Sequence, residues 1–340
     1  MSEAPVFEKK NVLVTGGAGF IGSHVCERLL QDARVMCLDN FTTSDVQNIN
    51  HLLKHPDFEF IRHDINTPFD PEQFPELTRF KVKFQGIQEI YHLACPTSPK
   101  KFDQYRMQTL YANSIGMKNA LDTAVRYRSK VLFASSCVVY GPRPTNNLPF
   151  KETEFGSSDL LSPRACYDEG KRFAEACCVT YRHVHGIDVR IARIFRTYGP
   201  RMPLYDGQMI PDFITDALDG KELELFGDET FRTSLIYVAD VVDGMLKLMH
   251  APPEVQVVNV GSDIDLPLLD VAQHIVEMTG STSKITFKPP LLFMSQLGLP
   301  DMTKSKEALG WIPLVTLDDG LKRTIEYTMS HKSLLSFRKN

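Results

Sequence analysis

The sequence predicts an α/β fold in which a doubly wound parallel sheet carries a smaller C-terminal lobe. Short, near-continuous apolar runs alternate with segments that have the periodicity of helices, and a glycine-rich turn joins the first run to the first helix. Such runs are typical of strands buried on both faces, with helices as the crossovers between them. A chain of 340 residues is also long enough to bury a large core.

Seven strands are predicted from the apolar runs. They lie at 12–14, 34–38, 58–64, 89–94, 130–136, 188–195 and 256–260, and the two longest helices are expected at 109–127 and 167–185. Ligands bind beyond the carboxyl ends of the strands in sheets of this kind. The residues that follow strands are therefore expected to surround the site, namely Asp64, 94–99, 135–140 and 196–201.

The turn after the first strand has the glycine spacing of a dinucleotide-binding loop. Gly16, Gly19 and Gly22 form the pattern G-x-x-G-x-x-G, and Gly17 also completes G-x-G-x-x-G. Glycines let the pyrophosphate approach the backbone amides, and the helix that follows offers the positive end of its dipole. A chance glycine turn is the alternative, but the strand before it and the helix after it are the context that the motif requires.

The end of the second strand indicates which dinucleotide is bound. Asp39 follows that strand near the position from which an acid binds the ribose 2′-hydroxyl. A carboxylate there repels a 2′-phosphate, and Asp45 adds to this effect. The sequence therefore predicts a Rossmann-type domain that binds NAD in preference to NADP.

A tyrosine and a lysine predict the chemistry of the site. Tyr167 and Lys171 are one helical turn apart, so their side chains share a face. An ammonium group beside a phenol is expected to lower the pKa of the phenol and make it a base. Ser136 ends an earlier strand and is expected to polarise the same substrate oxygen. A surface pair is the alternative for Tyr167 and Lys171 alone, but the serine makes the combination specific.

The chain is expected to divide into three regions. Residues 1–185 form the NAD-binding Rossmann domain with the Tyr/Lys helix, and 186–330 add the last strands and the substrate-binding lobe. Residues 331–340 are expected to be a solvated, mildly basic tail. Residues 1–10 contain no apolar stretch typical of a signal peptide, and no run of 18 apolar residues predicts a membrane span.

The composition of the chain limits the kinds of molecule that it is expected to bind. The formal net charge is −4, which argues against nucleic acid as a main partner. Seven cysteines are scattered without a C-x-x-C pair, as expected of a reduced cytoplasmic protein without a metal site. A small-molecule substrate is therefore expected.

Longer stretches resemble the extended short-chain dehydrogenase/reductases of the NAD-dependent epimerase/dehydratase family, which modify nucleotide sugars. The similarity is greatest to the members that decarboxylate UDP-glucuronate, and it runs over nearly the whole chain. The matching stretches are 14–24, 39–41, 92–96, Gly116, 163–172, 198–202, 237–240, 300–304 and 309–311.

The resemblance implies a reaction and its residues. Bound NAD oxidises a sugar hydroxyl, usually at C4, decarboxylation or epimerisation follows, and the hydride is returned. Tyr167, Lys171, Ser136 and Cys137 are the implied catalytic residues. The implied NAD contacts, besides Tyr167 and Lys171, are Gly16, Gly19, Phe20, Ile21, Gly22, Asp39, Asn40, Asp64, Ile65, Leu93 and Ala94. The implied substrate contacts are Pro96, Arg196, Arg201 and Arg232. A homodimer through helices at 113–127 and 167–185 is also implied.

The sequence departs from this family beside the catalytic serine. Val138 stands where the decarboxylases carry a glutamate, and Cys137-Val138 replaces the Asp-Glu of the dehydratases. An apolar residue at this position is more like the 4-epimerases. Cys137 is either a weak acid or base or simply a small buried residue.

Three further departures fall where the family binds the substrate diphosphate. Arg196 replaces the asparagine of Phe-Asn-Thr-Tyr-Gly-Pro, Thr233 replaces an arginine that here stands one place earlier as Arg232, and 295–299 replaces an arginine-rich run. Fewer guanidinium groups mean weaker bidentate phosphate binding. Arg196 is expected either to restore a cation or to bind a carboxylate or monophosphate.

These observations favour an NAD-dependent enzyme that decarboxylates or epimerises a nucleotide sugar. The alternatives are a dehydratase or 4-epimerase of an atypical nucleotide or nucleoside sugar, a simple ketoreductase, and a non-catalytic NAD-sensing protein. The presence of Tyr167, Lys171 and Ser136 argues against the last of these.

Overall fold

The computed structural model describes residues 9–289 and 296–337. The predictions that concern residues 1–8, Ser295 and the last three residues of the tail lie outside the described residues.

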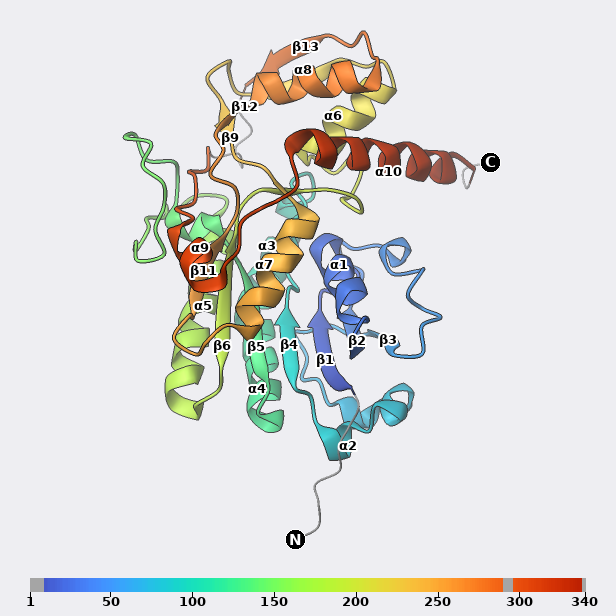
Figure 1. Ribbon diagram of the computed structural model, residues 1–340, viewed down its shortest axis with the longest axis vertical. Coiled ribbons are helices and arrows are strands. Elements are labelled where there is room, and N and C mark those ends of the chain that lie inside the picture. Colours follow the sequence, from blue (N-terminus) through green and yellow to red (C-terminus); the bar gives the residue numbers. More distant parts are fainter. Residues whose placement is uncertain (1–8, 290–295, 338–340) are drawn as a thin grey trace.

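A seven-stranded parallel sheet forms the centre of the molecule (Figure 1). Its strands stand in the order β11-β6-β5-β4-β1-β2-β3. They are β1 (Lys10–Thr15), β2 (Ala33–Asp39), β3 (Phe58–Arg62), β4 (Glu89–His92), β5 (Lys130–Ser136), β6 (Val189–Ile194) and β11 (Val257–Val260). Each predicted strand is present, so the prediction of a doubly wound parallel sheet is confirmed.

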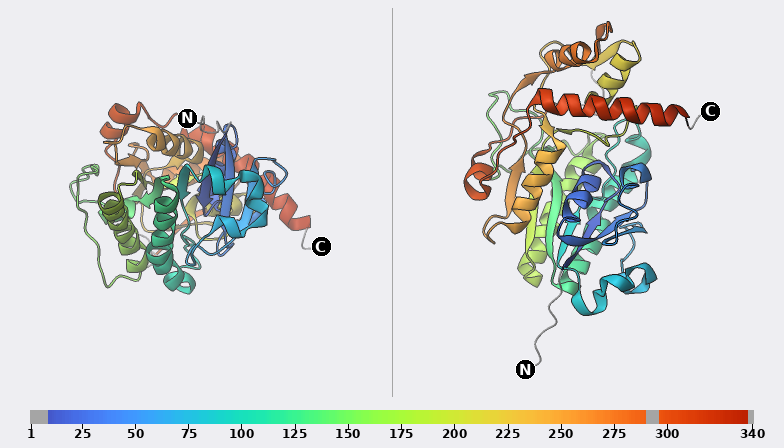
Figure 2. Two further views of the ribbon diagram at one scale, coloured as in Figure 1. Left: turned by 90° about the horizontal axis from the view of Figure 1, so that it is seen from below. Right: turned by 45° about the vertical axis from the view of Figure 1, so that its right-hand side comes forward.

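Helices cover both faces of the sheet (Figure 2). One face carries α1 (Phe20–Leu29) and α7 (Val238–His250), and the other carries α4 (Met117–Tyr127) and α5 (Ala165–His185). Most residues of the strands between them are buried, and most of those buried residues are apolar, because both faces of the sheet pack against helices. A buried Trp311 extends the core on the α1 and α7 side.

The helix expected at 109–127 is interrupted. The structure has α3 (Arg106–Tyr111), then a π-helical stretch, Ala112–Gly116, and then α4. Asn113 lies in this stretch and donates to the Thr109 carbonyl, and a Cβ at Gly170 of α5 would stand 3.1 Å from it. Wider turns of this kind are frequent at functional sites, and this one lies beside the helix that carries Tyr167.

A C-terminal lobe lies beyond the carboxyl ends of the strands, at the top of Figure 1. It packs α6 (Met209–Leu218), α8 (Leu268–Thr279) and α10 (Leu317–Phe337) around a separate apolar cluster, with β8 (Leu223–Phe226) paired to β13 (Ile285–Lys288). The remaining elements are short: α2 (Val82–Gln85), α9 (Thr303–Leu309), β7 (Thr197–Tyr198), β9 (Arg232–Thr233), β10 (Ile236–Tyr237) and β12 (Leu266–Pro267).

None of the helices in the described ranges is both long enough and apolar enough to cross a bilayer.

Candidate active site

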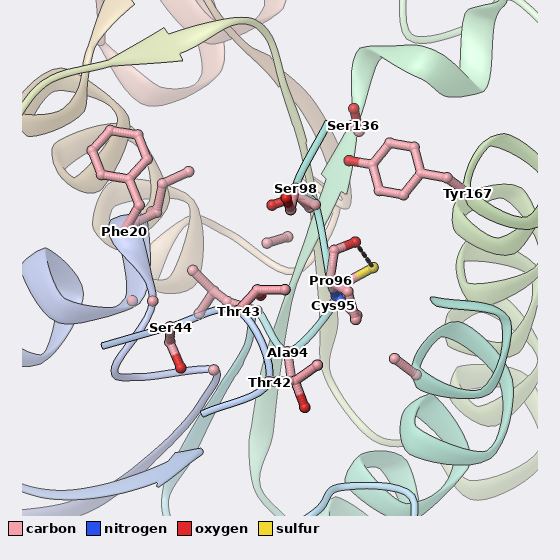
Figure 3. A pocket seen from close by; sticks show the side chains of 18 of the residues that line it. Phe20, Thr42, Thr43, Ser44, Ala94, Cys95, Pro96, Ser98, Ser136 and Tyr167 are labelled. Carbon is pink, nitrogen blue, oxygen red and sulfur yellow. Dashed lines mark hydrogen bonds between the residues drawn. The ribbon is translucent and has the colours of Figure 1, made fainter. Parts of the chain in front are cut away.

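A cleft of about 450 Å³ lies at the carboxyl ends of the strands (Figure 3). Its walls are the glycine turn, the residues that follow β2, β3, β4, β5 and β6, the start of α5, and the loop at 202–209. Parallel strands bring these chain segments together at one edge of the sheet, as the sequence predicted.

The glycine turn forms one end of the cleft and is too closely packed for side chains. A Cβ at Gly16, whose φ is +71°, would stand 2.8 Å from the Ala94 Cα, and a Cβ at Gly22 would collide with the Gly16 carbonyl oxygen. Gly19 caps α1 and provides no side chain, so the first amides of this helix have no side-chain acceptor. The residues therefore fit a pyrophosphate at the positive end of the helix dipole.

Asp39 stands at the side of the turn. Its carboxylate accepts hydrogen bonds from the Ala18 amide at 3.0 Å, the Phe41 amide at 2.9 Å and the Ser44 hydroxyl at 2.6 Å. These bonds fix a negative charge on the wall of the cleft next to the glycines. The position fits a ribose hydroxyl and disfavours a phosphate.

Tyr167 and Ser136 meet at the far end of the cleft. Tyr167 comes from the first turn of α5, and its hydroxyl points towards Ser136 at the end of β5 (Figure 3). Burial raises the pKa of Tyr167 and the neighbouring Cys95 adds to this effect, while the nearby Ser136 hydroxyl and the charge of Arg164 lower it. The two hydroxyls can thus hold one substrate oxygen between them and exchange a proton with it.

Lys171 lies one turn further along α5 but does not have the expected effect on the tyrosine. Its ammonium donates to the Ala134 carbonyl at 2.9 Å and lies 5.9 Å from the centre of the Tyr167 ring. Burial lowers the pKa of Lys171 itself. The expectation that Lys171 brings the Tyr167 pKa below its usual range is therefore not met, because burial of the phenol has the larger effect.

Cys137 and Val138 form the wall after Ser136, and both are buried. Burial raises the pKa of Cys137 to about 11, which favours the neutral thiol and the interpretation of Cys137 as a small buried residue. Val138 places an apolar side chain on this wall, next to Ser136.

Arg196 follows β6 and reaches the same cleft. One of its terminal nitrogens lies 3.4 Å from the Met209 Sδ, and its Nε is buried with no hydrogen-bond partner in the part of the chain that the structure describes. Burial lowers the pKa of this guanidinium, and the nearby charge of Arg164 adds to the effect.

The structure does not bring Arg201 and Arg232 to the cleft. Arg232 pairs through Nε with Asp265 at 2.6 Å. Neighbouring residues of β9 point to opposite sides of the strand, and because Thr233 points into the protein and is buried, Arg232 points outwards. Arg201 lies in a left-handed turn with φ +70° and pairs with Glu27 on α1. The expectation that these two arginines contact substrate is thus not supported by this geometry.

The other predicted site residues all line the cleft. They are Gly16, Gly19, Phe20, Ile21, Gly22, Asp39, Asn40, Asp64, Ile65, Leu93, Ala94, Pro96, Ser136, Cys137, Tyr167, Lys171 and Arg196. Asp206 was not among the predicted site residues, yet its carboxylate accepts a hydrogen bond from Ser98 in the same cleft. Asp206 lies in a loop whose path no strand or helix signal indicates. Arg164 belongs to the matching stretch 163–172, but its place beside Tyr167 was not predicted.

Comparisons with known proteins agree with this geometry. Residues 12–261 match the model of the NAD dependent epimerase/dehydratase family. A UDP-glucuronic acid decarboxylase 1 from Danio rerio is 38% identical over 321 residues, which are 94% of this chain and 73% of that protein. The UDP-glucose 4-epimerase of Thermotoga maritima, solved with UDP-glucose, has a TM-score of 0.82 and 30% identity over 95% of this chain and 99% of its own.

A second solved structure is similar over the same extent. It is the UDP-glucuronic acid 4-epimerase of Bacillus cereus in complex with UDP-glucuronic acid and NAD, with a TM-score of 0.82 and 26% identity over 94% of this chain and 99% of its own. The family match covers well over half of the chain, and the decarboxylase match covers nearly all of it. This chain belongs to the NAD dependent epimerase/dehydratase family.

Proposed function

We propose that this enzyme uses NAD to oxidise a hydroxyl of a UDP-glucuronate-like nucleotide sugar, that decarboxylation follows, and that the product is then reduced. The observation that carries the proposal is the Ser136–Tyr167 hydroxyl pair, which shares one cleft with the glycine turn. Similarity to UDP-glucuronic acid decarboxylases over 94% of the chain supports this substrate class.

The glycine turn and the Asp39 carboxylate are the groups proposed to hold NAD. The first amides of α1 fit its pyrophosphate, and Asp39 fits a ribose hydroxyl. When bound, NAD supplies a hydride acceptor that later returns the hydride. Lys171 is proposed to bind the nicotinamide ribose, because its ammonium lies on the face of α5 that also carries Tyr167.

Tyr167 and Ser136 are proposed to handle the proton of the reacting hydroxyl. Ser136 hydrogen-bonds the sugar oxygen, and the Tyr167 Oη takes the proton from it. A carboxyl group two carbons from the resulting carbonyl can leave as CO₂, with the electron pair of the broken bond passing to the carbonyl oxygen. The two hydroxyls then stabilise the negative charge on that oxygen, and water supplies a proton to the carbon.

Epimerisation with the carboxylate retained is the second candidate. The buried Val138 favours it, because an apolar wall beside Ser136 offers no additional acid or base. The structural similarity to a UDP-glucuronic acid 4-epimerase supports the same alternative.

The test is to incubate the protein with UDP-glucuronate and to follow released CO₂ and the sugar products by NMR. Decarboxylation predicts CO₂ and a UDP-pentose in equal amounts. Epimerisation predicts UDP-galacturonate without CO₂. An NAD-loaded, folded protein that converts UDP-glucuronate to neither product would contradict both candidates.

We also propose a homodimer that forms through α5 and the adjoining α3, in place of the helices at 113–127 and 167–185 that the family resemblance implies. Phe173 and Val184 of α5 are three turns apart on one helix face and are 54% and 69% exposed. Met107 and Tyr111 expose further apolar surface on the adjoining α3. Apolar side chains gathered on neighbouring helices are typical of an interface between subunits.

A reducing compartment, the cytoplasm, is the proposed location. All seven cysteines carry free thiols in the structure, and Cys26, Cys37, Cys137 and Cys178 are buried. Thiols that persist unpaired are typical of proteins kept in a reducing environment.

A further inference from the structure

Arg196 reaches the cleft with hydrogen-bonding capacity that the protein does not use. Among the described residues its Nε is buried without a partner, and a terminal nitrogen donates to the thioether of Met209 at 3.4 Å. A thioether is a weak acceptor. An unsatisfied buried donor costs about 1–3 kcal/mol, and more when the group is charged. A donor kept in this state is a candidate for a bond to ligand.

The other cations along the described walls of the cleft have protein partners. Lys171 donates to the Ala134 carbonyl, and Arg164 forms an ion pair with Asp168 at 3.1 Å. Arg196 forms no ion pair among the described residues, and the charged group that acts on it, Arg164, is itself a cation. The nearest wall residues therefore do not neutralise the Arg196 guanidinium.

The surroundings of Arg196 place it at the reacting end of the cleft. Cys137 and Arg164, which act on Arg196, also act on the Tyr167 hydroxyl. The backbone is held there as well, because the Ile236 amide donates to the Arg196 carbonyl at 3.0 Å. An anion bound by Arg196 thus lies near the carbon that reacts at Tyr167.

We propose that Arg196 forms a subsite for an oxyanion of the substrate, and that this oxyanion is the sugar carboxylate. The inference rests on the proposed function and names the group that selects its substrate. The carboxylate is favoured over the diphosphate because Arg196 lies beside Cys137, next to the Ser136–Tyr167 pair. A guanidinium can hold a carboxylate through two parallel hydrogen bonds.

The register of β9 supports the same assignment. Arg232 points away from the cleft to Asp265, and its neighbour Thr233 is buried but does not line the cleft. The described lining of the cleft therefore has a cation at Arg196 and none from β9. The positive charge is thus at the end of the cleft where the sugar is proposed to react.

The test compares ligand binding in variants that cannot turn over. Tyr167→Phe holoenzyme and the double variant Tyr167→Phe/Arg196→Met are titrated by calorimetry with UDP-glucuronate, UDP-glucose and UDP. The double variant is expected to bind UDP-glucuronate roughly 10- to 100-fold more weakly, as lost hydrogen bonds to a charged group predict. Its affinities for UDP-glucose and UDP should change less than about threefold. Arg79→Met, which removes an exposed arginine outside the cleft, is the matched control and should change none of them.

Two results would overturn the assignment. Equal weakening for all three ligands would place the diphosphate at Arg196, and no weakening for any of them would leave Arg196 without a ligand. Thermal unfolding of the ligand-free protein provides a second readout. Replacing an uncompensated charge by Met should leave the melting temperature unchanged or raise it, whereas a marked fall would mean that Arg196 is structural.

The proposed function and this inference fail in different ways. If wild-type protein does not convert UDP-glucuronate, the proposed function fails whatever the titrations show. If wild-type protein converts it but the double variant binds it as tightly as Tyr167→Phe alone, only the role of Arg196 fails.

Discussion

At the scale of single residues, the site depends on how burial and hydrogen bonding act on one phenol. Burial raises the pKa of Tyr167, and the nearby Ser136 hydroxyl opposes that effect. Ser136 is thus proposed to have two roles: it contacts the substrate oxygen, and it makes its neighbour a better base. These roles can be separated by a pH profile.

Ser136→Ala should lower kcat at neutral pH by roughly tenfold or more, because one donor to the reacting oxygen is lost. Since the Ser136 hydroxyl lowers the Tyr167 pKa, removing that hydroxyl should also move the rising limb of the kcat–pH profile to higher pH. Ser136→Thr keeps the hydroxyl and should retain the wild-type limb. A uniform loss of rate with no change in the profile would mean that Ser136 does not act on the phenol.

Gly22→Ala should abolish NAD binding, because the added Cβ collides with the Gly16 carbonyl oxygen in the turn proposed to hold the pyrophosphate. Gly19→Ala is the matched comparison, since its Cβ would stand 3.1 Å from the same oxygen and requires only a small shift. The measurement is the NAD content of the purified variants, followed by titration with NAD. Equal NAD affinity in both variants would contradict this packing argument.

At the scale of elements, the sheet could be predicted and the directions of individual side chains could not. Seven apolar runs were sufficient to place all seven strands, because a strand buried on both faces leaves an unambiguous pattern. Arg232 shows the limit: a shift of one residue along β9 turns its side chain to the other face. Asp206 shows another, since a long loop can cross the site without a periodic signal.

The π-helical stretch between α3 and α4 was missed for a similar reason. The apolar periodicity of 109–127 predicts one continuous helix, and a single wider turn hardly changes that periodicity. The raised Tyr167 pKa could not be foreseen either, because residue spacing reveals the distance along a helix but not the depth of burial.

The exposed apolar face of α3 and α5 predicts the oligomeric state. Phe173→Glu/Val184→Glu should convert a dimer to a monomer in sedimentation velocity experiments, because two charges would be buried without partners at the interface. Phe84→Glu changes a residue that is 78% exposed on α2 and should leave the dimer intact. A wild-type protein that sediments as a monomer would contradict the proposed interface.

At the scale of the whole molecule, two histidines should make the fold sensitive to acid. Burial lowers the pKa of His24 to about 4 and that of His92 to about 3. In the unfolded chain both titrate near 6.5, so between these limits the unfolded state binds more protons and stability falls as the pH falls. Each histidine should cost about 2 kcal/mol at pH 5 relative to pH 8.

Urea unfolding at pH 8, 6.5 and 5 measures this loss. His24→Gln should reduce the dependence of the unfolding free energy on pH, whatever its effect on absolute stability. The matched control is His55→Gln, which changes a half-buried histidine in the connection between β2 and β3. An unfolding free energy that stays constant from pH 8 to pH 5 would contradict the burial of two neutral imidazoles.

The proposed chemistry depends on Tyr167 taking the proton of the reacting sugar hydroxyl, and its replacement by phenylalanine is the decisive experiment. Wild-type and Tyr167→Phe holoenzymes are given UDP-glucuronate without added NAD, and both product formation and ligand binding are measured. Tyr167→Phe is expected to keep its NAD and its affinity for UDP-glucuronate but to form product about 10²- to 10⁴-fold more slowly. Product formation at the wild-type rate in Tyr167→Phe would show that another group takes the proton.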